Sequence, residues 1–164
     1  MRTLKTISKI FLLTVSAFML SCSSDSDGGG SDTGFYLKAK IDGANYANSS
    51  SFEPMATIAG GTLNIQSSND GGDAIQIQVP NYTGVGTYNS GNNDLTQGYV
   101  NYLDTNLSAG TFVSYTSVRG TGQVIVTEVT DTAIKGTFTA TVIENEDGST
   151  NDKAITNGTF RVEL

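Results

Sequence analysis

The sequence predicts an all-β domain over residues 35–164, built as an antiparallel two-layer sandwich or a flattened calycin-like barrel of about ten strands. Apolar residues recur at every second position in several runs, the longest being Ile134-Lys-Gly-Thr-Phe-Thr-Ala-Thr-Val142. Such alternation places one face of a strand in a core and the other in water, which is typical of antiparallel sheets. Clusters of Gly, Asn and Asp separate the runs and tolerate the backbone angles of tight hairpins.

We predict eleven strands, at residues 35–41, 44–47, 55–59, 62–68, 74–79, 85–88, 97–103, 111–116, 122–130, 133–144 and 153–163. No segment of this region has a 3.6-residue amphipathic period long enough for a helix. Many short strands in one small domain imply two packed layers, because a single open sheet would leave an apolar face wet. A sandwich rich in meanders is our preferred arrangement, and the calycin-like barrel is the alternative.

Residues 1–21 have the pattern of a secretory signal peptide. Three basic residues precede an apolar run of eleven residues, Ile10 to Leu20. This run is shorter than the roughly 20 residues that a membrane-spanning helix needs. A basic start, a short apolar run and then small residues are typical of a signal that is later removed.

Cys22 follows this apolar run directly and is the only cysteine in a chain that has no histidine. An intramolecular disulfide and a Cys/His metal site are therefore excluded. Met19-Leu20-Ser21-Cys22 resembles the lipobox of bacterial lipoproteins, in which the cysteine is acylated and the chain is cut just before it. The resemblance implies lipidation of Cys22 and attachment to a membrane outside the cytoplasm.

Residues 22–34 follow as the lipidated cysteine and a tether, in which residues 23–34 are only Ser, Asp, Gly and one Thr. Such a segment is expected to be a flexible leash with a root-mean-square span of about 20 Å. Ser24, Asp25 and Asp27 resemble the export signal that sends Bacteroidetes lipoproteins to the outer face of the outer membrane. We expect a lipid-anchored outer-membrane location, at the cell surface or the periplasmic face.

The formal charge limits the partners of the chain. Removing residues 1–21 takes away three basic residues and no acidic residue, which lowers the charge from −7 to −10. Nucleic acid is excluded as a partner, because it needs clustered Lys and Arg to neutralise phosphates. The expected contact with the membrane is the lipid anchor and not the protein surface.

Several segments, in this order, cover nearly the whole domain: Leu37–Gly43 with Tyr46, Ile75–Pro80 with Gly86–Tyr88, Gly122–Glu128, Ile134–Phe138 and Ile155–Phe160. Together they resemble a family of Bacteroidetes lipoproteins of unknown function. The resemblance implies a secreted, anchored β domain without an established activity.

No enzymatic activity and no cofactor are expected. Without histidine the commonest general base is missing. Paired carboxylates could support glycoside hydrolysis, and the acids available for it are Glu53, Asp70, Asp73, Asp94, Asp104 and Glu128. Three of the six, Asp70, Asp73 and Asp94, lie next to Gly or Asn, where acids usually stabilise the turn itself.

Two acidic loops are weak candidates for calcium, residues 69–73 and 144–152, with Asp70, Asp73 and Asp147 as the ligands. Neither loop has the EF-hand spacing, and we favour turn chemistry for both, so no resident metal is expected.

Five of the seven tyrosines lie between residues 81 and 115, among several Asn and Gln residues. Aromatic rings beside amides are the components of a carbohydrate platform, and Tyr82, Tyr88 and Tyr99 are the candidate ligand contacts. Alternation places Tyr99 on the outward face of its strand and Tyr102 on the other face. The alternative is that these rings pack across strands.

Asp131-Thr132-Ala133 resembles the O-glycosylation sequon of Bacteroidetes secreted proteins, which makes Thr132 a candidate glycosylation site. The whole sequence favours a membrane-anchored extracytoplasmic lipoprotein with a non-catalytic binding or structural β domain. The alternatives are a glycan-binding accessory protein and a lipocalin-like carrier of a small apolar ligand. Polysaccharides and other surface proteins are the candidate partners.

Overall fold

The computed structural model describes residues 34–164, which form ten β-strands. Their bounds are β1 (Tyr36–Ile41), β2 (Ala44–Ala47), β3 (Met55–Ala59), β4 (Thr62–Ser68), β5 (Ala74–Val79), β6 (Gly86–Gly91), β7 (Tyr99–Asn106), β8 (Thr111–Val129), β9 (Ala133–Glu144) and β10 (Asp152–Glu163). Within residues 34–164 there is no helix that could cross a membrane. The predictions for the signal peptide, Cys22 and residues 23–33 lie outside the described residues.

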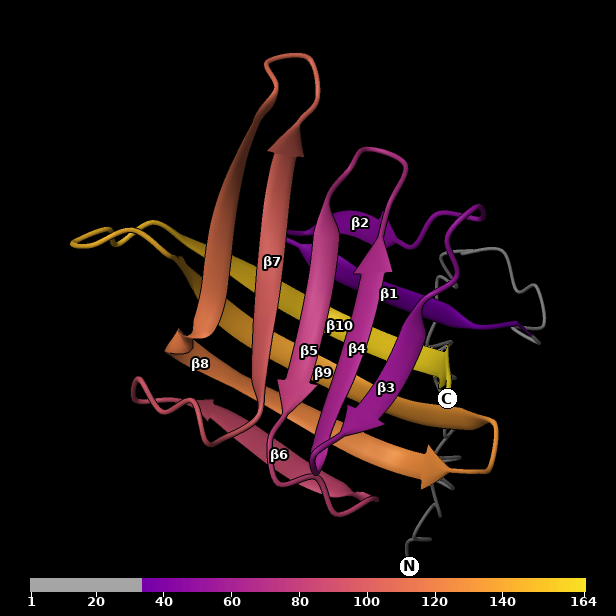
Figure 1. Ribbon diagram of the computed structural model, residues 1–164. Helices are drawn as coiled ribbons and strands as arrows, with labels where there is room; N and C mark the ends of the chain where they lie inside the picture. Colours follow the sequence, from indigo (N-terminus) through magenta and orange to yellow (C-terminus); the bar gives the residue numbers. More distant parts are fainter. Residues whose placement is uncertain (1–33) are drawn as a thin grey trace, which may run out of the picture. The chain divides into compact units, whose positions relative to one another are not determined.

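The strands form two layers that cross one another (Figure 1). The front layer contains β3, β4, β5, β7 and the first part of β8, and the back layer contains β2, β1, β10, β9, the second part of β8 and β6. Because β8 pairs with β7 and with β9, it carries the hydrogen-bonded ladder from one layer to the other. On the opposite side a single parallel residue pair, Glu163 with Met55, joins β10 to β3. The layers thus form a flattened barrel.

The predicted all-β antiparallel fold is confirmed, and most predicted strands agree with the observed ones within one to three residues. The number of strands differs, because the two strands predicted at 111–116 and 122–130 are parts of one strand, β8. The register of β8 against β9 shifts between Thr116 and Thr121, so the alternation is interrupted by a bulge inside a continuous strand.

The bulge in β8 is held by Ser117, which is fully buried. Its Oγ accepts hydrogen bonds from Ser90 Oγ and from the backbone N of Val100, both at 2.8 Å. Gly120 is required at the bend, since a Cβ there would lie 2.0 Å from the carbonyl oxygen of Thr141. The strand can therefore turn between the layers only with glycine at this position.

Apolar side chains from both layers fill the space between them. The largest fully buried ones are Leu37, Leu63, Ile65, Ile75, Ile77, Ile134, Phe138, Ile155 and Phe160. Phe138 lies opposite Gly158, and Phe160 lies opposite Gly136 on the neighbouring strand. Each glycine leaves room for the ring that its partner strand contributes, and the two ring centroids are 6.4 Å apart. The repeated Gly-Thr-Phe sequence of β9 and β10 thus reflects a reciprocal packing arrangement.

Polar groups close one end of the space between the layers. Tyr46 is only 4% exposed, and its hydroxyl lies 3.1 Å from Ser67 Oγ. Lys153 Nζ lies 3.2 Å from Asp104 and 3.6 Å from Asp42. These contacts give the Tyr46 hydroxyl and the Lys153 ammonium group polar partners at this end of the core.

Candidate functional site

The outward face of the front layer carries a set of amide side chains. Strands β4, β5 and β7 alternate buried apolar residues with outward polar ones. Most of these polar residues are Asn or Gln, and one is a tyrosine. We call this surface the amide face and define it by Asn64, Gln66, Gln76, Gln78, Tyr99 and Asn101.

Strand register orders the amide face into two rows that cross the strands. In one row Gln66 pairs with Gln76, which pairs with Asn101. In the other row Asn64 pairs with Gln78, which pairs with Tyr99. Cross-strand neighbours have Cβ atoms roughly 4.5–5.5 Å apart. Each row therefore presents one polar side chain per strand at a nearly constant spacing.

Hydrogen bonds orient the side chains within each row. Asn101 Nδ2 donates to Gln76 Oε1 at 3.2 Å, and the Tyr99 hydroxyl donates to Gln78 Oε1. Burial raises the pKa of the Tyr99 phenol, which therefore stays protonated at neutral pH. A primary amide has two N–H donors and two acceptor lone pairs, so each keeps further hydrogen-bonding capacity for a ligand.

A hollow of about 600 Å³ adjoins the amide face on its β3 side. Gln66 and Gln76 form part of its lining, together with residues of the segment before β3. Two apolar side chains stand at its rim, Phe52 at 66% exposed and Met55 at 58% exposed. This end of the face thus combines amide groups with accessible apolar surface.

A second hollow, of about 420 Å³, adjoins the amide face on its β8 side. Tyr99 and Asn101 line it, and Leu95, which is 64% exposed, contributes apolar surface. Gln76 lines the first hollow and Asn101 lines the second, and these two amides are hydrogen-bonded to each other. The hollows are therefore the two ends of one surface that runs from β3 to β8.

Arg119 fixes the wall of this second hollow. Its Nη1 donates to the carbonyl oxygens of Glu144 and, at 2.6 Å, of Glu146, and its Nη2 donates to that of Ser149 at 3.2 Å. Ser149 Oγ and Asn151 Nδ2 in turn donate to the Glu144 carboxylate, at 2.6 and 2.7 Å. These two bonds lower the pKa of Glu144, with that from Ser149 the larger cause. The turn between β9 and β10 is thus held against the β8 edge of the amide face.

Residues 35–162, which span all ten strands almost completely, match the family model described as Domain of unknown function (DUF6252). The chain belongs to the DUF6252 family. Comparison with curated proteins and with solved structures finds no match. The predicted membership of a β-domain family of unknown function is confirmed, and the lipoprotein and Bacteroidetes assignments stay predictions.

The predicted tyrosine contacts of the DUF6252 domain lie in two places. Tyr99 is on the amide face, in agreement with the alternation of its strand. Tyr82 and Tyr88 instead pack on the hydrophobic core and on each other, with ring centroids 5.9 Å apart. The Tyr88 hydroxyl donates to the carbonyl oxygen of Gly84 at 2.7 Å. The structure therefore does not bring the three rings together in one platform.

Sequence reasoning missed four residues of the amide face, Asn64, Gln66, Gln76 and Gln78. The signal was present in the alternating runs Leu-Asn-Ile-Gln and Ile-Gln-Ile-Gln-Val, whose polar members are all amides. The polar residues of an alternating strand ordinarily form just the solvated side of a sheet. The strand order of the DUF6252 domain is needed to place the four amides in rows with Tyr99 and Asn101.

The weak calcium candidates serve turns. Asp73 accepts hydrogen bonds from Asn69 Nδ2 at 3.1 Å and from the backbone N of Thr105 at 2.9 Å, and thereby joins two loops. Asp70 and Asp147 are exposed in the turns after β4 and β9. In the described part of the chain, no group of three or more Cys, Asp or Glu side chains is placed to hold a metal ion.

The acids considered for glycoside hydrolysis have separate local contacts. Glu128 pairs with Lys135 at 3.0 Å, and Asp104 pairs with Lys153. Asp94 accepts hydrogen bonds from Thr96 and Gln97. Glu53 lines the hollow beside β3.

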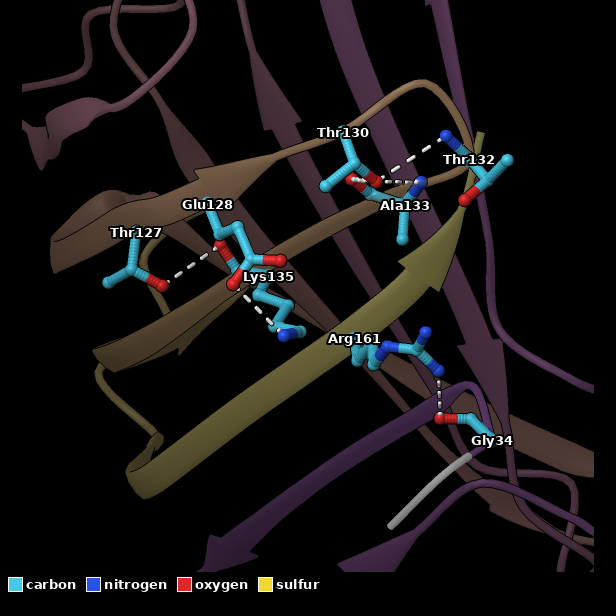
Figure 2. Close-up of polar contacts among 8 residues, drawn as sticks. All are labelled: Gly34, Thr127, Glu128, Thr130, Thr132, Ala133, Lys135 and Arg161. Atoms are coloured by element: carbon cyan, nitrogen blue, oxygen red, sulfur yellow. Dashed lines mark hydrogen bonds and ion pairs between the residues drawn. The ribbon is translucent and has the colours of Figure 1, made fainter.

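Thr132 lies in the turn between β8 and β9 and is exposed (Figure 2). Thr130, rather than Thr132, supplies the hydroxyl that closes this turn, because its Oγ1 accepts from the backbone N of Ala133 at 3.0 Å. Thr132 is thus accessible and does not cap the turn, and its O-glycosylation stays a prediction. A mass shift in the wild-type chain that is absent from Thr132→Ala would support it, whereas an unmodified wild-type chain would contradict it.

Proposed function

We propose that this protein is an extracytoplasmic lipoprotein that is anchored to the outer membrane through Cys22 and binds its ligand without catalysis. The observation that carries the binding role is the amide face, which offers two ordered rows of polar groups between two hollows. The lipobox-like residues 19–22 and the Ser/Asp/Gly-rich leash after them support the anchor. The resemblance to Bacteroidetes lipoproteins supports the same location.

The chemistry of the amide face favours binding over catalysis. Its side chains are amides and a protonated phenol, none of which is a general base at neutral pH. Two acids, Glu53 and Glu163, lie in the hollow on the β3 side, at the end of the rows. The six side chains of the face can therefore hold a ligand by hydrogen bonds, and the two acids lie beside the face rather than on it.

A lipocalin-like carrier is the second candidate, and it would need an apolar cavity between the layers. The fully buried side chains fill this space, and the rings of Phe138 and Phe160 are among them, with centroids 6.4 Å apart. This packing favours the outward amide face over the interior as the place where a ligand binds.

The anchor is tested by growing cells with a clickable fatty acid and comparing the wild-type chain with Cys22→Ala. We expect the label and the membrane fraction to contain the wild-type chain and not the variant. Ser23→Ala is the matched control and should keep both. An unlabelled wild-type chain, or a Cys22→Ala chain that keeps its label, would contradict the anchor.

Protease added to intact cells distinguishes the two faces of the outer membrane. Degradation of the wild-type chain would place it at the cell surface, and protection would place it on the periplasmic face. If the chain is surface-exposed, replacing both Asp25 and Asp27 by Ala should protect it from the protease. Unchanged degradation of that variant would contradict the export role of these acids.

A further inference from the structure

We infer that the amide face binds an extended, uncharged polysaccharide that lies across strands β3, β4, β5, β7 and β8. This inference rests on the proposed function, because it names the ligand class of the face that carries that function. Its basis is the chemistry of the two rows, their direction across the sheet and the apolar surface at both ends.

The hydrogen-bonding groups of the amide face match hydroxyl groups. A primary amide has both donors and acceptors, and a sugar hydroxyl also does both, so each amide can meet a hydroxyl in either role. The five amides and Tyr99 carry no charge at neutral pH. A ligand rich in hydroxyls thus finds partners along the whole face, and a charged group finds no opposite charge among these six side chains.

The rows also fit an extended chain. Neighbouring strands are about 4.8 Å apart, so the four steps from β3 to β8 span roughly 19 Å. The Gln66–Gln76–Asn101 row is continuous with the two hollows at its ends. A linear ligand would meet one polar side chain of the row on each of β4, β5 and β7 and would reach a hollow at either end, and a single sugar would fill only a fraction of this length.

Apolar groups stand where the faces of sugar rings would lie. The Tyr99 ring is half-buried beside Gln78 in the second row. Phe52 and Leu95 are exposed at opposite ends of the surface, on the β3 and β8 sides. Sugar rings combine apolar faces with polar edges, and a surface that has amides in its middle and apolar groups at its ends complements both.

Two other ligand classes are disfavoured. An extended peptide usually binds by pairing with a free sheet edge, whereas β4, β5 and β7 are each paired on both sides. An anionic polymer would meet Glu53 and Glu163 at the β3 end. At the β8 end, the guanidinium of Arg119 is already bound to backbone carbonyl groups. These charges favour a neutral chain.

The test uses the full-length protein purified in detergent and isothermal titration with defined polymers. The neutral probes are amylose, mixed-linkage β-glucan, xylan and galactomannan, and the anionic probes are alginate and polygalacturonate. We expect binding to at least one neutral probe. In that case Gln76→Ala combined with Asn101→Ala should weaken it about tenfold or more, because several hydrogen bonds are lost.

Gln123→Ala is the matched control, because Gln123 is an amide on the outward face of the back layer, where it donates to Asn89 at 3.0 Å. The affinity of the Gln123→Ala variant for the polymer should stay within about twofold of that of the wild type. A change of this size corresponds to less binding free energy than one typical hydrogen bond contributes. Thermal unfolding of all variants checks that the fold persists. Loss of binding in both variants, or in neither, would overturn the assignment to the amide face.

A length series tests the extended mode. Affinity for oligosaccharides of the bound polymer should rise with length until they span roughly 19 Å, and then level off. A monosaccharide that binds as tightly as the polymer would overturn this geometry. Binding only to anionic probes, or to no probe, would overturn the ligand class. The proposed function would still be upheld in those cases by two results. One is fatty-acid labelling at Cys22, and the other is capture of a surface protein by the wild-type chain but not by the Gln76→Ala, Asn101→Ala variant.

Discussion

Gly136 and Gly158 show how single residues determine the packing between β9 and β10. A Cβ at Gly136 would lie 2.2 Å from the carbonyl oxygen of Ile125 and 2.4 Å from the Phe160 ring. A Cβ at Gly158 would lie 2.4 Å from the carbonyl oxygen of Phe138. Backbone oxygens cannot rotate away, so an added methyl group must displace the strand or the ring.

We therefore expect Gly136→Ala and Gly158→Ala each to lower the free energy of unfolding by about 1–3 kcal/mol through overpacking. Urea unfolding of the full chain measures the difference. Gly34→Ala is the control, because a Cβ there meets nothing within 4 Å, and its stability should change by less than about 0.5 kcal/mol. Equal stability of all three variants would contradict this account of the Gly-Thr-Phe sequences.

At the scale of elements, the turn between β9 and β10 depends on the guanidinium group of Arg119. Arg119 donates to three carbonyl groups, those of Glu144, Glu146 and Ser149. Lysine has the same charge but lacks the planar fork that reaches several acceptors at once. Arg119→Lys should increase hydrogen exchange in residues 145–151 about tenfold or more, because roughly 1–2 kcal/mol of local stabilisation is lost.

Exchange in β4 and β5 serves as the internal control for this variant, since these strands pair with β3, with each other and with β7, and not with β9 or β10. Faster exchange throughout the domain would mean global destabilisation, and unchanged exchange in the turn would mean that Arg119 does not hold it. Because the turn lines the hollow beside β8, a loosened turn is also expected to weaken ligand binding at that end of the amide face.

The same turn is expected to be sensitive to acid. Bonds from Ser149 and Asn151 lower the pKa of Glu144, so the folded state favours the carboxylate. Its stabilising effect is complete above the pKa of an unfolded glutamate, about 4.3, and is lost as pH falls through the lower folded value. Exchange in residues 145–151, corrected for intrinsic rates, should therefore rise on going from pH 6 to about pH 3. Glu144→Gln should show a flatter dependence, and a steep dependence in that variant would assign the effect to another acid.

Periodicity predicted the elements well, because alternation in runs such as Ile75–Val79 is a local property. It could not reveal that β8 is one strand, since the bulge at Ser117–Gly120 interrupts the period without ending the ladder. It also could not place the tyrosines. β5 pairs with β7 and not with β6. Strand β6 lies at the edge of the back layer, where Tyr88 pairs with Val124 and packs against the core. The amide face itself depends on this non-sequential strand order.

For the whole molecule, two buried phenols connect the packing of the layers to pH. Burial raises the pKa of Tyr46 to about 12, partly offset by its hydrogen bond to Ser67. Burial also raises the pKa of Tyr102, and the nearby carboxylates of Asp73 and Asp104 raise it further. Both rings lie at the polar end of the core, so ionisation of either hydroxyl would place a charge where the two layers meet.

We expect global stability to fall as pH rises above 10. A phenol whose folded pKa exceeds its unfolded value of about 10 stabilises the fold fully below pH 10, and this contribution is lost as pH rises through the folded value. For Tyr46 a shift to about 12 corresponds to roughly 2–3 kcal/mol, because one pKa unit equals about 1.4 kcal/mol. Urea unfolding between pH 8 and pH 11.5 measures this decline.

Two variants test its cause. Tyr46→Phe should lower stability at pH 8 by about 1 kcal/mol through the lost hydrogen bond, and the stability of this variant should then decline less with pH. Ser67→Ala keeps the buried phenol of Tyr46, so the stability of this variant should fall with pH as steeply as that of the wild type. If the stability of Ser67→Ala did not change with pH, the hydrogen bond, and not burial, would control the titration of Tyr46.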